Sequence, residues 1–292
     1  MELEKWQALG NDYLIVEGRR LTFPLGREQV KLLCNRNLGV GSDGVLLLEE
    51  AAGEAVARLR IFNPDGSEAE LSGNGAREAS LYLHLRGWTA QRRFKVLTKA
   101  GTIEPEVLPD LRARLLLGRA SVRSRDYPSG PSDGGGVLSA AGRELAFQHV
   151  HVGNPQCAVR IADLAELEGL DLSQLGPPIE SSPLFPNRTN VSFFAPVEEG
   201  RIRARIFERG VGETLSSGTG AAGAAVAYAL SLGRLPTKVF VELDGGELEV
   251  EISADLEIRQ TGWAKPVCRV TLDPVFVEEL AALEKEQAEE RS

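Results

Sequence analysis

Short apolar runs separated by glycine-rich or polar turns dominate the chain, a pattern that predicts many strands and few helices. Residues 3–18 are expected to form a strand, a turn at 9–12 and a second strand. Helical spacing is found at 27–34 and 163–175, and residues 277–290 predict a charged helix or tail. Further strands are expected at residues 45–48, 57–62, 94–97, 102–107, 112–117, 144–152, 157–161, 191–195, 202–207 and 269–275, with a hairpin over 239–250.

One segment of the chain occurs twice. Residues 60–76 begin with Arg-Ile-Phe, contain Glu68 and end in Ser-Gly-Asn-Gly-Ala, and residues 205–221 repeat this pattern at a constant offset of 145. Each copy predicts a strand, a loop and an apolar helix, with the helices at 76–85 and 221–230. A repeat of this length indicates two pseudo-equivalent halves. The turn-rich loop at 124–136 lies near the midpoint, where one half should give way to the other.

The start of each repeated helix is a candidate anion site. The first N–H groups of a helix have no intrahelical partner, the helix dipole is positive there, and glycine lets a ligand approach the backbone. Two such ends facing one another would hold a single carboxylate and place Ser72 and Ser217 on opposite faces of the attached carbon. The alternative is a duplicated helix cap, because serine is a preferred N-cap residue.

Size and charge restrict the function further. A chain of 292 residues predicts about two domains, and a net charge of −9 with a pI near 5.1 argues against a nucleic-acid partner. The N-terminus does not resemble a signal peptide, and no apolar run approaches membrane-spanning length. We therefore expect a cytoplasmic protein with neither nucleic-acid nor membrane partners.

Cysteine and histidine do not indicate a metal site. Cys34, Cys157 and Cys268 contain no CxxC pair and are expected to be buried or free thiols. His149 and His151 alternate on an expected strand, so they share a face. Hydrogen-bonded strand histidines are favoured over a zinc pair because no third ligand cluster is visible.

Several longer motifs resemble those of diaminopimelate epimerase, a family of the cofactor-independent amino-acid racemases. They occur in the family's order and cover nearly the whole chain. The motifs are LGND at 9–12, GVGSDG at 39–44, FNPDGSE at 62–68, GNGAR at 73–77, GNP at 153–155, NRTN at 187–190, ERGVGETL at 208–215 and GTGA at 218–221.

The resemblance implies an α+β fold of two pseudo-symmetric halves. Each half would be a curled, mostly antiparallel sheet around a central helix, with the active site in the cleft between the halves. The last strand would return to the first half, so the expected domains are 1–118 with 265–292, and 119–264. A homodimer is the assembly that the family suggests.

The resemblance also implies an activity, the inversion of LL-diaminopimelate to its meso form in lysine and cell-wall biosynthesis, without metal or other cofactor. Ser72 and Ser217 occupy the acid and base positions. Arg209 suits a distal carboxylate, because guanidinium binds carboxylate in a bidentate manner, and Glu208 with asparagine carbonyls suits a distal ammonium. The matching substrate positions are Asn11, Asn63, Gly73, Asn74, Asn154, Asn190, Glu208, Arg209, Gly218 and Thr219.

Two departures affect the chemistry. The family uses cysteines at both acid–base positions, and it usually has histidine where this chain has Gln156. A thiol ionises near pH 8.5 and an alcohol several pH units higher, and each pKa unit corresponds to about 1.4 kcal/mol. Replacing cysteine by serine as the base should therefore slow the proton transfer on the order of thousands-fold. Three interpretations stay open: an inactivated variant, a slow or diverged isomerase for diaminopimelate or another amino acid, and an amino-acid-binding protein. Glu68 or Glu213 as a replacement base is the less favoured hypothesis.

Overall fold

The computed structural model describes residues 1–289, and these form two compact units. The first unit contains Met1–Leu115 and the segment from Trp263 onward, and the second contains Leu116–Gly262. The expected domain boundaries, 118 and 265, lie three and two residues C-terminal to those in the structure, Leu115 and Trp263. The chain changes unit within two strands, β9 (Arg112–Arg119) and β18 (Glu257–Trp263), and not at a turn. Residues 290–292 of the expected first domain, and the end of the expected helix 277–290, lie outside the described residues.

The first unit contains a mixed sheet in the order β19-β1-β2-β3-β4-β6-β7, with β5 paired to β4. Strand β19 pairs antiparallel with β1, which confirms that the chain returns to its first half after the second. The strands are β1 (Glu2–Ala8), β2 (Asn11–Glu17), β3 (Val45–Glu49), β4 (Ala55–Phe62), β5 (Glu68–Ala69), β6 (Lys95–Thr98), β7 (Gly101–Ile103) and β19 (Lys265–Thr271).

The second unit contains a sheet that runs β10-β11-β12-β13-β14-β16-β17-β18, with β15 paired to β14. The expected hairpin over 239–250 is confirmed as β16 and β17. The strands are β10 (Gly135–Ala140), β11 (Arg143–His151), β12 (Pro155–Arg160), β13 (Asn190–Glu198), β14 (Arg201–Glu208), β15 (Gly212–Thr214), β16 (Thr237–Leu243) and β17 (Gly246–Ile252).

The two sheets repeat the same topology, which confirms the internal duplication. In the first, β2 pairs parallel with β3, β3 antiparallel with β4, and β4 parallel with β6. In the second, β12, β13, β14 and β16 pair in the same sequence of directions. Both sheets end this series with an antiparallel hairpin. The repeated segments found in the sequence are therefore the central strand and helix of each unit.

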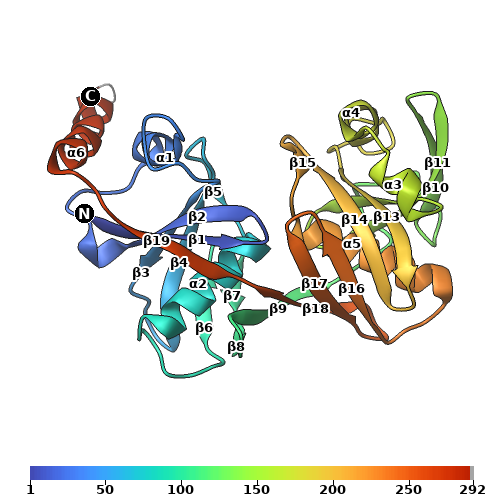
Figure 1. The fold of residues 1–292 in the computed structure, drawn as a ribbon, viewed down its shortest axis with the longest axis horizontal. Coiled ribbons are helices and arrows are strands. Elements are labelled where there is room, and N and C mark those ends of the chain that lie inside the picture. Colours follow the sequence, from blue (N-terminus) through green and yellow to red (C-terminus); the bar gives the residue numbers. More distant parts are fainter. Residues whose placement is uncertain (290–292) are drawn as a thin grey trace. The chain divides into compact units, whose positions relative to one another are not determined.

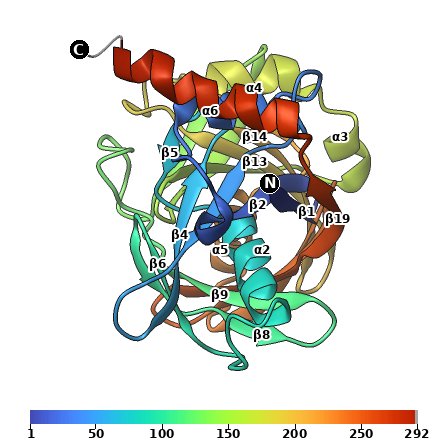
Figure 2. The same cartoon turned by 90° about the vertical axis from the view of Figure 1, so that its left-hand side faces the viewer.

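Each sheet curls around the repeated helix of its unit, α2 (Gly73–Leu85) or α5 (Gly218–Leu232) (Figure 1). Figure 2 shows α2 with strands of the first sheet around it, and α2 contacts β1 through β4. Helix α5 is rich in alanine and glycine and is buried along most of its length. A Cβ at Gly223 would lie 2.8 Å from the Cβ of Gln156 on β12, so small residues let the sheet approach the helix closely.

Further helices cover the outer face of each sheet. In the first unit these are α1 (Arg27–Cys34) and α6 (Pro274–Glu289), and in the second α3 (Leu164–Glu168) and α4 (Leu172–Glu180). Because helices lie on both faces, the central strands are apolar on both faces too. Leu14 and Val16 of β2 belong to the outer core, and Ile15 between them is also buried. This explains why the central strands appear in the sequence as continuous apolar runs.

Four sequence expectations are corrected. Residues 163–175 were expected to form one helix, but the chain turns between α3 and α4, where Asp171 caps the second helix. Residues 102–107 are divided between β7 and β8 (Glu106–Leu108) around Pro105, which lacks the N–H that a strand ladder needs. The segment that each copy of the repeat predicts as a loop between its strand and its helix contains a short strand, β5 in the first copy and β15 in the second. Strands β10 and β18 were not predicted from the sequence.

The cysteine prediction is confirmed for residues 1–289. Cys34 and Cys157 are buried, Cys268 is exposed, and all three are free thiols. Among the helices of this described part, none combines the length and apolar character that a membrane crossing requires.

Candidate active site

Ser72 is the N-cap residue of α2 in the first unit. Its backbone is extended (φ −131°, ψ 124°), and its Oγ accepts a hydrogen bond from the backbone N–H of Gly75 at 3.1 Å. The hydroxyl of Tyr13 donates to the same Oγ at 3.2 Å. Two donors and a helix N-terminus therefore converge on this oxygen, an environment that favours negative charge on it.

Ser217 is the N-cap residue of α5 and has nearly the same backbone geometry (φ −138°, ψ 125°). Its Oγ accepts from the N–H of Gly220 at 3.3 Å, but it donates to Oε2 of Glu208 at 2.9 Å. Thr214 donates to the other oxygen of Glu208 at 2.8 Å. Burial raises the pKa of Glu208, although these two hydrogen bonds act in the opposite direction.

The two serines thus share a backbone position but differ in their side-chain partner. Ser72 receives a phenol hydrogen bond, whereas Ser217 gives one to a carboxylate. Sequence analysis assigned Glu208 to the substrate ammonium and did not identify Tyr13. The only sequence signal for Tyr13 was an aromatic residue with a polar tip within an otherwise apolar strand.

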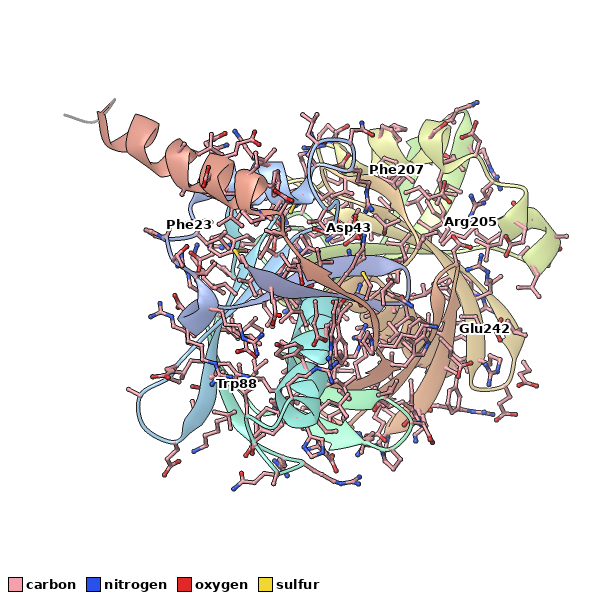
Figure 3. The ribbon with its side chains drawn as sticks, turned by 60° about the vertical axis from the view of Figure 1, so that its left-hand side comes forward. Phe23, Asp43, Trp88, Arg205, Phe207 and Glu242 are labelled. Atoms are coloured by element: carbon pink, nitrogen blue, oxygen red, sulfur yellow. The ribbon has the colours of Figure 1, made fainter. Side chains whose placement is uncertain are left out.

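The asparagines of the first unit lie where β2 begins and where β4 ends, on either side of β3. Asn11 opens β2 and donates through Nδ2 to Oδ2 of Asp43 at 3.0 Å. Asp43, labelled in Figure 3, precedes β3 by two residues. Asn63 follows β4 and donates to Oγ of Ser67 at 3.0 Å. The pairing of β2, β3 and β4 therefore brings these loops to the same end of the sheet.

Gly73 and Asn74 form the first turn of α2, as the sequence predicted for a helix start. The side-chain oxygen of Asn74 accepts from Nη2 of Arg77, which is fully buried together with Glu78. Burial lowers the pKa of Arg77 to about 10 and raises that of Glu78 well above its usual range. A buried guanidinium therefore fixes the Asn74 amide at the helix start.

Asn190 of the second unit acts as an internal brace. Its Nδ2 donates to the carbonyl of Pro155 at 3.1 Å, and its Oδ1 accepts from the backbone N–H of Arg209 at 2.9 Å. Both ends of this amide are engaged by the backbone. The Arg209 side chain is exposed and donates through Nη1 to the carbonyl of Asn187 at 2.8 Å.

Gln156, the residue that departs from the family pattern, holds Asn154. Its Nε2 donates to Oδ1 of Asn154 at 2.6 Å, and the glutamine is fully buried against Gly223 of α5. Gly218 and Thr219 begin α5, and the Gly218 carbonyl accepts from a buried glutamine of β18. The structure thus assigns Gln156 a positioning contact with a residue that the sequence predicted to bind substrate.

The repeated glutamates form repeated ion pairs. Glu68 binds Arg60 with 2.9 Å between Oε2 and Nη2, and Glu213 binds Arg205 with 2.6 Å between Oε1 and Nη2. Arg205 is labelled on β14 in Figure 3. The Arg60 guanidinium holds the pKa of Glu68 below its usual range. Both carboxylates tie the loop before the helix to the central strand, which supports the structural role over a role as base.

The two strand histidines are hydrogen-bonded, as predicted. His149 is buried, and its Nε2 lies 2.9 Å from Oγ of Ser124, while Nδ1 of His151 lies 3.1 Å from Oδ2 of Asp126. Burial lowers the pKa of His149 to about 4. Within residues 1–289, no group of three or more His, Cys, Asp or Glu side chains is arranged to hold a metal ion.

The fold is shared with solved structures of racemases and related isomerases. A phenazine biosynthesis protein of the PhzF family from Bacillus anthracis matches with a TM-score of 0.70 over 94% of this chain and 99% of that one, at 18% identity. A hydroxyproline epimerase from Agrobacterium vitis matches with a TM-score of 0.65 over 95% and 94%, at 17% identity. The chain therefore has the two-repeat fold of this class, as the resemblance implied.

Sequence comparison narrows the class to one family. The diaminopimelate epimerase model matches residues 4–122 and 148–267. Diaminopimelate epimerase 2 of a Nostoc species is 38% identical, over 89% of this chain and 92% of its own, and diaminopimelate epimerase of Desulforudis audaxviator is 42% identical, over 86% and 91%. The chain belongs to the diaminopimelate epimerase family. The roles of the individual site residues, the cleft between the halves, the cytoplasmic location and a homodimer stay predictions.

Proposed function

We propose that this chain inverts the α-carbon of diaminopimelate by proton removal and return, with Ser72 and Ser217 as the acid and base residues. The relatives that carry the name diaminopimelate epimerase cover most of the chain and support this substrate. The observation that carries the proposal is the pair of serine-capped helix starts. Both place a hydroxyl oxygen at a helix N-terminus, at equivalent positions of the two repeats.

The different partners of the serines assign them different roles. Glu208 is the acceptor for the proton that Ser217 must lose when its oxygen takes the α-proton of the substrate. Ser72, with Tyr13 as its donor, returns a proton to the resulting carbanion. One proton leaves carbon and one arrives, so no oxidant or reductant is required. The turnover leaves Glu208 protonated and Ser72 one proton short, and proton exchange with solvent restores both. The high pKa of an alcohol makes this a slow enzyme relative to one with cysteines.

The charged ends of the substrate match side chains of the second unit. Arg209 is exposed, and its guanidinium has donors beyond the one directed at Asn187. This geometry suits a carboxylate at the far end of the substrate. Asn154, positioned by Gln156, supplies an amide close to the same loop.

Solvent-deuterium exchange tests this proposal. LL- or meso-diaminopimelate incubated with the protein in D2O should gain deuterium at an α-carbon, and optical analysis should show interconversion of the two isomers. The variant Ser72→Ala/Ser217→Ala is the matched control and should show neither. Equal exchange by the parent and this control would refute the assigned roles.

A second candidate function is non-catalytic amino-acid binding. Serine at both positions favours it, since an alcohol is a poor base. It predicts calorimetric binding of diaminopimelate without isotope exchange over long incubation. Exchange above the level of the alanine control would exclude it.

A further inference from the structure

A largely apolar hollow of about 480 Å³ lies in the second unit, between the sheet and the C-terminal part of α5. Its walls include Ala158 and Phe194 from the sheet and Ala227 and Leu230 from the helix. Ser217 lies at the start of the same helix, ten residues before Ala227, which corresponds to about 15 Å along the helix axis. The hollow is therefore separate from the serine-capped helix start.

The duplication places an equivalent hollow, of about 350 Å³, in the first unit. Strand register identifies the equivalent residues. Arg160 pairs with Phe194 in the parallel ladder of β12 and β13, as Glu17 pairs with Leu48 in the ladder of β2 and β3. Both pairs lie three residues beyond the one that meets the repeated phenylalanine of the central strand. Arg160 is therefore the equivalent of Glu17, and each lines the hollow of its unit.

The first unit fills this space with its own side chains. The Tyr82 hydroxyl donates to Oε1 of Glu17 at 2.8 Å, and Arg86 forms two hydrogen bonds with a glutamate of β1. The constant offset of 145 makes Ala227 and Ser231 the equivalents of Tyr82 and Arg86. The second unit thus lacks both the phenol ring and the guanidinium that occupy the equivalent space in the first.

Arg160 is an unpaired cation at the wall of this hollow. Its side chain makes no hydrogen bond or ion pair within residues 1–289. A guanidinium is a donor only, so it requires an acceptor where the equivalent Glu17 receives the Tyr82 hydroxyl. Asp133 also lines the hollow, but its Oδ1 accepts from the backbone N–H of Gly135 at 3.1 Å.

We propose that this hollow binds an aromatic carboxylate. The ring occupies the space that Tyr82 fills in the first unit, against Phe194 and Leu230, and the carboxylate pairs with Arg160. Guanidinium binds carboxylate through two parallel hydrogen bonds, and the volume is within the range of small-molecule sites. The binding is reversible, involves no covalent step and does not depend on the epimerase activity.

Calorimetric titration of the full chain at pH 7.5 tests the charge and the ring together. The probes are 3-phenylpropionate, the neutral 3-phenylpropanol and the cationic 3-phenylpropylammonium, which share one ring and one chain length. The carboxylate should bind saturably and about tenfold tighter than the alcohol, because hydrogen bonds between charged groups are the stronger ones. Absence of saturable carboxylate binding would overturn the proposal. Equal binding of the ammonium would also overturn it and would assign the charge preference to Asp133.

Two variants locate the site. Arg160→Met keeps an apolar stem at an exposed position and should lower the affinity for the carboxylate about tenfold, to that of the alcohol, while the alcohol binds as before. Arg92→Met, which changes an exposed arginine of the first unit, is the matched control and should change neither affinity. Unchanged carboxylate binding by Arg160→Met would refute the assigned pairing.

Ala227→Tyr tests the internal comparison directly. It introduces the ring of Tyr82 at the equivalent position of α5, so it should abolish binding of both the carboxylate and the alcohol. The melting temperature of this variant shows whether the fold is retained, and the Arg160→Met result does not depend on it. Undiminished binding by folded Ala227→Tyr would place the ligand outside the hollow and refute the proposal.

Discussion

Replacing both serines by cysteine should convert this chain into a much faster epimerase. The free thiol ionises near pH 8.5, and the serine hydroxyl at least about three units higher, a difference of about 4 kcal/mol in the cost of the anion. That energy corresponds to about a thousandfold in rate. The gain in rate should be larger at position 72, because a helix N-terminus and the Tyr13 hydroxyl stabilise a thiolate there.

The surroundings predict a different protonation state for each new cysteine. At position 217 the neighbouring carboxylate of Glu208 opposes a thiolate and accepts a hydrogen bond from a thiol. Ser72→Cys/Ser217→Cys should therefore hold thiolate at 72 and thiol at 217 near neutral pH, so that position 72 becomes the base and position 217 the acid, the reverse of the roles proposed for the serines. Of the single variants, Ser72→Cys should alkylate faster with iodoacetamide than Ser217→Cys, and at a lower pH midpoint.

The rate is measured as deuterium incorporation at the α-carbon of diaminopimelate in D2O. The alanine double variant provides the background. Each serine-to-cysteine substitution also weakens a helix cap, so the melting temperature should fall by an amount equivalent to about 1 kcal/mol per site. A folded cysteine double variant with no more exchange than the parent would refute both the acid–base assignment and the assigned substrate.

Three further changes test contacts within single units. Glu208→Gln should stabilise the protein increasingly as pH rises from 4.5. Burial raises the folded-state pKa of Glu208, so the stability that this carboxyl contributes is complete below its unfolded-state pKa and is lost as pH rises through its folded-state pKa. Urea unfolding from pH 4 to 8 measures the difference between variant and parent, and a pH-independent difference would contradict the argument. Gly223→Ala places a Cβ 2.8 Å from that of Gln156 and should cost about 1–3 kcal/mol by thermal unfolding. Gly135→Ala, whose Cβ would meet nothing closer than 3.5 Å, is its control and should change little. Arg77→Leu removes a fully buried guanidinium and should destabilise the protein by about 3 kcal/mol in chemical denaturation, and a change below 1 kcal/mol would argue against its bracing role.

The sequence by itself determined the repeat, the helix starts and the family. These features are local, because a serine followed by two spaced glycines before an alanine-rich run specifies an N-cap and a helix whatever surrounds it. The central strands were also readable, since burial on both faces leaves continuous apolar runs such as 45–48. Strands β10 and β18 were missed because glycine and mixed polar residues give them no such run.

Only the tertiary structure decided which side chains meet the two serines. Tyr13 lies 59 residues before Ser72, a separation that carries no periodic signal. Glu208 was identified from its motif, but its bond to Ser217 follows from the end of β14 lying beside the start of α5. Strand pairing fixes such contacts, and pairing depends on which distant segments bury their apolar faces together, a choice that no local stretch of sequence specifies.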